Sequence, residues 1–203
     1  MGLLRDMFGP SKEEIWGQLA ADIGATYQEG GFWREDVLRY SSGQWVVTLD
    51  TYTVSTGKSS TTYTRMRAPF VNRDGLYFKV YRSGVLTGIG KALGMQDITV
   101  GNPIFDEAFV VKGNNEERIR QLFGDPNYVA LLESQPQVCF EVRNDEGWFG
   151  AKFPEGVDEL HFLCYGVVKD ADRLRGLFDL FTATLERLVQ IDSAYANDPM
   201  VRL

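Results

Sequence analysis

The sequence predicts an α+β fold with an antiparallel sheet, and three observations support this. Several short segments alternate between apolar and polar residues, which is typical of half-buried strands. These segments follow one another through short turns, as in hairpins and meanders, and the helical segments stand apart from them. With 203 residues, 44% of them hydrophobic, the chain can bury one large core. We therefore expect a single domain over residues 1–203, with a short apolar arm at 1–10 and a frayed tail at 194–203.

An N-terminal helix is predicted over residues 12–23. Ser11 and Glu14 have the spacing of a capping box, in which each side chain accepts a hydrogen bond from the other residue's backbone. Apolar residues then recur at helical spacing as far as Ile23, and Gly24 follows as a stop signal.

A hairpin is predicted from residues 45 to 68, with its turn at residues 55–60. If the turn is centred at Gly57-Lys58, Tyr52 lies opposite Tyr63, and Asp50 lies opposite Arg65. The alternate residues of both strands are apolar, so they form a continuous core face.

A third strand at residues 76–82 follows the turn dipeptide Asp74-Gly75. A tight turn there would direct Lys79 to the core, so we expect a connection shifted by one residue, which directs Phe78 and Val80 inward. The outer face of the three strands then collects tyrosines and cations: Tyr52, Tyr63, Arg65, Arg67, Tyr77, Lys79 and Tyr81.

The second half of the chain is predicted to hold four strands, a central pair of short helices and a long helix. The strands are expected at residues 107–112, 137–143, 148–153 and 159–166. The first short helix begins at Asn114, with Glu117 as its reciprocal capping partner, and ends at Gly124, while the second begins at Asp125-Pro126.

The long helix is predicted at residues 170–192. Its apolar residues form a stripe that we expect to pack on the sheet: Leu174, Phe178, Phe181, Leu185 and Leu188. A coiled-coil partner is the alternative, but the repeat covers only two heptads.

Charge is segregated along the chain. The net charge is −7 and the pI is about 4.8, yet residues 58–91 carry one acid, Asp74, against seven bases: Lys58, Arg65, Arg67, Arg73, Lys79, Arg82 and Lys91. Residues 102–160 carry twelve acids against five bases. This pattern predicts either a surface for an anionic partner or two patches that pair with each other. The net negative charge of the chain argues against binding to nucleic acid.

The residue types limit the available chemistry. His161 is the single histidine, and together with Cys139 and Cys164 it gives too few ligands for a structural zinc site. The two cysteines fall on opposite strand faces by alternation, which argues against a disulfide. We expect no metal and no cofactor, and we interpret His161 as a half-exposed strand histidine.

A glycine-rich segment at residues 84–101 is the alternative site. A short helical turn there could direct amides to a phosphate near Gly88, Gly90 and Lys91. The spacing is not G-x-G-x-x-G and no βαβ unit surrounds it, so this interpretation, a small nucleotide-binding or phosphate-binding enzyme or hydrolase, ranks second.

The segment Phe105-Asp106-Glu107-Ala108-Phe109-Val110-Val111, followed by a capped helix, resembles a family of uncharacterised bacterial domains. In that family an F-D-x-x-F-x-V strand precedes a short helix. The resemblance covers about the last hundred residues and implies a bacterial origin without an established activity. Family members often carry membrane segments, but no apolar run of this chain approaches the 18 residues of a membrane span.

We therefore expect a cytoplasmic, non-catalytic binding or protein-interaction module. Its tyrosine-bearing and cation-bearing sheet face would hold an anionic segment of a protein partner or of a second copy of the chain, so a homo-oligomer is one option. A further option is that the apolar start docks on a membrane or a partner, although it is too short to anchor alone.

Overall fold

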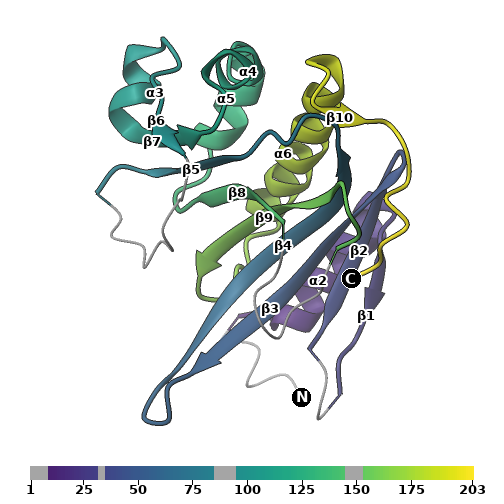
Figure 1. Cartoon of the computed structure of the whole chain (residues 1–203). Helices are drawn as coiled ribbons and strands as arrows, with labels where there is room; N and C mark the ends of the chain where they lie inside the picture. The colour runs from purple at the N-terminus through teal and green to yellow at the C-terminus, as the bar shows by residue number, and fades with distance from the viewer. Residues whose placement is uncertain (1–8, 32–34, 85–94, 145–152) are drawn as a thin grey trace.

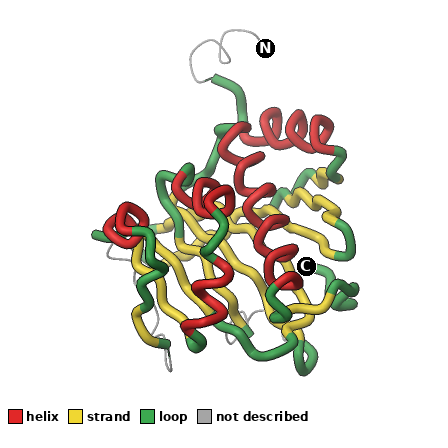
Figure 2. The backbone as a smooth tube through the Cα atoms, turned by 90° about the horizontal axis from the view of Figure 1, so that it is seen from above, coloured by secondary structure: helices red, strands yellow, loops and turns green. Residues whose placement is uncertain are grey.

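The computed structural model describes residues 9–31, 35–84, 95–144 and 153–203, and it has the expected α+β fold. Ten strands among these residues form one antiparallel sheet in the order β1-β2-β3-β4-β9-β8-β5-β7-β6, with β10 paired to β4 (Figure 1). Helices gather on one side of the sheet (Figure 2). The strands are β1 (Thr26–Gln28), β2 (Val37–Ser42), β3 (Trp45–Ser55), β4 (Ser60–Asn72), β5 (Phe78–Arg82), β6 (Gln96–Asp97), β7 (Phe109–Gly113), β8 (Cys139–Arg143), β9 (Val157–Tyr165) and β10 (Ala194–Tyr195). The helices are α2 (Lys12–Ile23), α3 (Pro103–Ala108), α4 (Glu116–Leu122), α5 (Pro126–Glu133) and α6 (Ala171–Gln190).

The N-terminal helix α2 begins and ends where the sequence predicts. The Ser11 side chain accepts a hydrogen bond from the backbone N–H of Glu14, and the Glu14 carboxylate accepts one from the backbone N–H of Ser11. Gly24 follows at a φ of 69°, in the left-handed region that glycine adopts without strain. Trp16 and Leu19 are buried and pack the helix against the core.

The long helix α6 packs along the sheet through the predicted stripe. Every residue of the stripe is buried: Leu174, Phe178, Phe181, Leu185 and Leu188. The ring of Phe181 lies edge-on to Phe140 of β8, with 5.2 Å between the centroids. The stripe therefore belongs to the core of this chain, as expected.

The predicted hairpin and its register are confirmed. β3 and β4 pair without interruption, with Asp50 opposite Arg65 and Tyr52 opposite Tyr63. The chain reverses over Thr56–Ser59, where Gly57 has a φ of 78°.

The prediction of which strand lies beside β4 is wrong. We expected the third strand, now β5, to follow β4 directly in the sheet, but β9 and β8 lie between them. β9 pairs with β4 over eight positions, from Thr64 opposite Cys164 to Val71 opposite Val157, whereas β5 has only five residues. The longer strand satisfies more of β4's backbone hydrogen bonds, and the local pattern could not reveal a partner 86 or more residues away.

Two boundaries in the centre of the chain also differ from the prediction. The segment Phe105–Ala108 belongs to helix α3, whose N-cap is Asn102, so the strand expected from residue 107 begins at Phe109. The next helix, α4, is capped by Asn115 and not by Asn114. The Asn114 side chain instead accepts a hydrogen bond from the backbone N–H of Tyr77 and donates one to the carbonyl of Gly75.

Several segments were not predicted, or fall outside the described residues. β1, β2, β6 and β10 had no predicted counterpart. Within the segment expected as a tail, β10 pairs with β4, and the Arg39 guanidinium donates to the backbone carbonyl of Leu203. The strand expected at 148–153 lies almost wholly outside the described residues, as does the helical turn around Lys91. Among the described residues, no helix has the length and apolar character needed to span a membrane.

Candidate functional site

Most of the residues expected on the outer face do lie on one face, the side of the sheet opposite the core. Leu49, Met66, Phe162, Phe140 and Val80 are buried cross-strand neighbours in the core. Because successive strand residues point to opposite faces, the adjacent row of cross-strand neighbours lies on the other face. That row consists of Thr48, Arg67, His161, Glu141, Lys79, Lys112 and Asp97.

Asp50 binds both arginines of the hairpin. The Arg65 Nε and Nη2 atoms donate to the two carboxylate oxygens of Asp50, each at 2.8 Å. Arg67 Nη2 donates to Asp50 Oδ2 at 2.5 Å. The side chains of Asp50 and Arg67 are almost fully buried, while 19% of the Arg65 side chain stays exposed. Both arginines therefore share one carboxylate of their own hairpin.

Lys79 belongs to a second buried group. Its Nζ atom lies 2.9 Å from Glu141 Oε2, and Arg143 Nε donates to Glu141 Oε1 at 2.6 Å. Burial, followed by the nearby carboxylate of Glu141, raises the pKa of the Cys139 thiol on the same face, so this thiol is not activated as a nucleophile.

His161 lies between the two groups and is buried, with only 3% of its surface exposed. The interpretation of a half-exposed histidine is therefore wrong, because strand neighbours on both sides carry long side chains. Burial, and then the positive charges of Arg143, Arg65, Arg67 and Lys79, hold its pKa well below the usual value.

The contact with Arg143 fixes the histidine tautomer. Arg143 Nη1 lies 3.2 Å from His161 Nε2. A guanidinium only donates hydrogen bonds, so Nε2 must accept and the proton resides on Nδ1. His161 is thus a neutral acceptor between cations, and it joins β9 to β8.

Three tyrosines form a cluster at the end of this face. Tyr52 and Tyr63 are opposite each other in the hairpin, and Tyr63 meets Tyr165 of β9 edge-on, with 6.1 Å between the ring centroids. Arg65 stacks over the Tyr52 ring at 5.1 Å. Tyr52 and Tyr165 remain 45% and 71% exposed. We call Tyr52, Tyr63 and Tyr165 the tyrosine cluster.

The remaining two predicted tyrosines lie elsewhere. Tyr77 precedes β5, packs against the core and donates its hydroxyl to Asp158 at 3.1 Å, so it does not share the outer face. Tyr81 lies on that face opposite Cys139, but β8 and β9 separate its strand from β4. Tyr165 was missed by the sequence reasoning. Alternation places it with His161, but its proximity to Tyr63 depends on the pairing of β9 with β4.

The other described bases of residues 58–91 do not form a patch with Arg65, Arg67 and Lys79. Arg73 pairs with Asp192 at 2.6 Å, and Arg82 donates to the backbone carbonyls of Gln135 and Glu133. Lys58 is exposed at the hairpin turn. Gly88, Gly90 and Lys91, the alternative phosphate site, lie outside the described residues.

The expected pairing of the bases with the acids of residues 102–160 is correct for Lys79 and Glu141. Asp50 and Asp192, which bind Arg65, Arg67 and Arg73, lie outside that range. The charge pattern along the chain did not single out these two acids.

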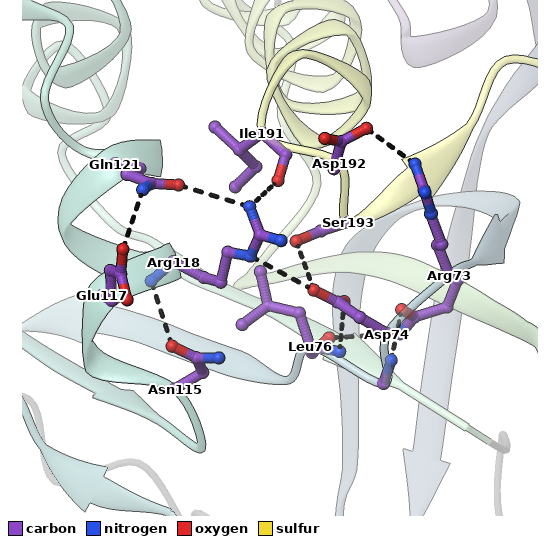
Figure 3. Close-up of polar contacts among 12 residues, drawn as sticks. Arg73, Asp74, Leu76, Asn115, Glu117, Arg118, Gln121, Ile191, Asp192 and Ser193 are labelled. Carbon is purple, nitrogen blue, oxygen red and sulfur yellow. Dashed lines mark hydrogen bonds and ion pairs between the residues drawn. The ribbon is translucent and has the colours of Figure 1, made fainter.

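A second polar cluster lies beyond the other end of β4 and holds the end of α6 (Figure 3). The Arg118 guanidinium of α4 donates to the carbonyl of Ile191, which follows α6, and its Nε atom lies 3.4 Å from Asp74 Oδ2. Ser193 Oγ donates to the same Asp74 oxygen at 3.0 Å. A cation near a helix C-terminus stabilises the helix dipole. These contacts anchor α6 to α4 and to the connection after β4.

No group of His, Cys, Asp or Glu side chains in the described part of the chain is placed to hold a metal ion. The charged groups on the outer face bind one another, and their arrangement serves to join strands. Tyr52 and Tyr165 of the tyrosine cluster expose large aromatic side chains on this face.

Comparison with known proteins finds a similar fold but no related sequence. No family model matches the sequence, and no curated protein matches it. The fold is similar to that of a solved structure, the mycobacterial trehalose monomycolate transport factor A, TtfA, with a TM-score of 0.53. The two share 9% sequence identity, and the match covers 94% of this chain and 98% of TtfA. At this identity the likeness shows the fold alone.

Proposed function

We propose that this protein is a non-catalytic binding module that contacts a partner protein through the tyrosine cluster. The observation that carries the proposal is the exposure of Tyr52 and Tyr165 beside Tyr63, on a face where the ion pairs of Arg67 and Lys79 are buried. Tyrosine is enriched in protein interfaces because it combines a large apolar ring with a hydroxyl that forms hydrogen bonds.

The binding surface is narrower than the basic face expected from sequence. Arg67 and Lys79 are buried against Asp50 and Glu141, so they do not offer free positive charge to an anionic partner. Arg65 reaches the surface, but its guanidinium already binds Asp50 and covers Tyr52. We assign these cations the role of holding the tyrosines in place.

The paired strands that carry the tyrosine cluster favour its use as a binding surface. Tyr52 and Tyr63 lie within one uninterrupted β-ladder, and Tyr165 ends a strand that pairs with β4. Rings that are ordered before binding lose little conformational entropy when a partner contacts them. The partner of this chain is left to experiment.

Photo-crosslinking tests the proposal. A photoreactive phenylalanine analogue replaces Tyr165 in one variant and Tyr195 in the other, and both are expressed in the natural host. Tyr195 is a matched control because it is 49% exposed and lies on β10, which pairs with the far end of β4. We expect a discrete crosslinked partner from position 165 that is absent from position 195 and lost when Tyr52→Ala is added. The same products from both positions, or none from position 165, would refute the proposal.

A further inference from the structure

The hairpin of β3 and β4 extends beyond its neighbours in the sheet. In the described part of the chain, β2 pairs with β3 as far as Leu49, and β9 pairs with β4 from Thr64 onward. The hairpin therefore continues as a two-stranded arm, which we define as Thr53–Thr62 (Figure 1, lower left). On the β4 side, Gly166 donates its N–H to the carbonyl of Thr62. On the β3 side, Thr53, Val54 and Ser55 are exposed.

The hydrogen bonds of the arm show which backbone groups point outward. Thr56 N–H donates to the carbonyl of Ser59, so these two residues form a hydrogen-bonded pair. In an antiparallel ladder such pairs alternate with pairs whose backbone groups point away from each other. Ser55 and Thr53 therefore direct their N–H and C=O groups to the outer edge of β3. The bond between Gly166 and Thr62, the residue opposite Thr53, agrees with this alternation.

This edge lacks the features that protect free edges in other proteins. Such edges are commonly very short, charged, bulged or interrupted by proline. The outer strands β1 and β6 of this sheet have three and two residues. In contrast, β3 has eleven residues, pairs with β4 without a bulge, and carries neither charge nor proline from residue 51 to residue 57.

We propose that the outer edge of the β3 arm pairs with the same edge of a second copy of this chain. An antiparallel arrangement with its two-fold axis at Val54 places Thr53 opposite the second copy's Ser55. Both residues direct donors and acceptors outward, so the two edges are complementary. Val54, which is 37% exposed, then packs against the second copy's Val54.

A second copy fits this edge better than a charged partner does. The chain carries a net charge of −7, so copies repel one another over most orientations. The arm edge is neutral and allows close approach without like charges opposite each other. One such edge on each copy gives a closed pair, since a two-fold interface uses the same surface on both subunits. Three paired residues on each side are fewer than in a standard interface, so the dimer should be weak.

Charge-swapped variants test this pairing by sedimentation equilibrium at high protein concentration. We expect the wild type to dimerise, and Val54→Lys and Val54→Glu alone to associate at least tenfold more weakly because like charges face each other across the axis. An equimolar mixture should recover association. Ile104→Lys, an exposed position on α3, serves as the matched control and should dimerise as the wild type does.

A monomeric wild type, or a mixture of the two variants that does not associate, would overturn the inference. Oxidation of Val54→Cys gives an independent readout, because opposed residues of a pair without mutual hydrogen bonds lie close enough for a disulfide. The wild-type chain under the same oxidation shows what Cys139 and Cys164 contribute. This inference concerns the strand edge and goes beyond the proposed function. Loss of partner binding in Tyr165→Ala with an intact dimer, or the reverse, would therefore separate the two.

Discussion

Removal of the Asp50 carboxylate tests the idea that the outer face is held by buried ion pairs. In Asp50→Asn the isosteric amide keeps the shape of the side chain, but Arg67 loses the negative charge of Asp50 while only 8% of its side chain is exposed. Breaking one partner of a buried pair costs about 3 to 5 kcal/mol, because the remaining charge stays desolvated. For a chain of this size that loss corresponds to a fall in Tm of about 6 to 20 °C.

Denaturant titration of the wild type and Asp50→Asn measures the loss directly. The matched control is Glu116→Gln, which removes an exposed pair with Arg120 and should change the free energy of unfolding by about 0.5 kcal/mol or less. Arg65→Met should be milder than Asp50→Asn, since it leaves Asp50 paired with Arg67. A loss below about 1 kcal/mol in Asp50→Asn would mean that water reaches these groups, and the argument for buried pairing would fail.

Three further predictions concern the core and the buried histidine. Phe181→Ala should lower the free energy of unfolding by about 3 to 5 kcal/mol in a denaturant titration, because it removes a fully buried ring and leaves a cavity in the core; a loss under 1 kcal/mol would contradict that packing. Gly113→Ala should destabilise by about 1 to 3 kcal/mol, since its Cβ atom would lie 2.8 Å from Ile119 Cγ1; an unchanged Tm would show that Ile119 moves freely. His161 has a lowered folded-state pKa, so unfolding takes up a proton below the unfolded pKa of about 6.5. Stability should therefore fall as the pH drops through that value, by up to about 1.4 kcal/mol per pH unit, and His161→Gln should remove this part of the slope.

Local patterns predicted the elements whose partners are near in sequence. The capping box of α2, the stripe of α6 and the register of β3 with β4 each depend on residues fewer than about 20 positions apart. Turn geometry and side-chain periodicity determine such features, so they can be deduced from a short window.

Longer-range contacts could not be deduced in the same way. The chain gives no local signal that β9 lies between β4 and β8, because many antiparallel orders satisfy the same alternation. The face assignment of Lys79 was nevertheless correct, since it depends on alternation and not on which strand is adjacent. Tyr165 shows the converse case. Its face followed from alternation, but its contact with Tyr63 required the unpredicted pairing.

The buried row on the outer face also explains how the sheet keeps its register. A shift of one residue in β4 or β5 would turn Arg67 or Lys79 toward the helices and expose the apolar residues beside them. Each of these cations instead meets an acid from another strand, Asp50 for Arg67 and Glu141 for Lys79. A well-packed apolar face could be equally stable or more so, so we infer that the ion pairs are retained because they select one alignment of β3, β4, β8 and β5. That alignment brings Tyr52 beside Tyr63, and under the proposed function the charges of this face act on binding through the geometry that they impose on the tyrosine cluster.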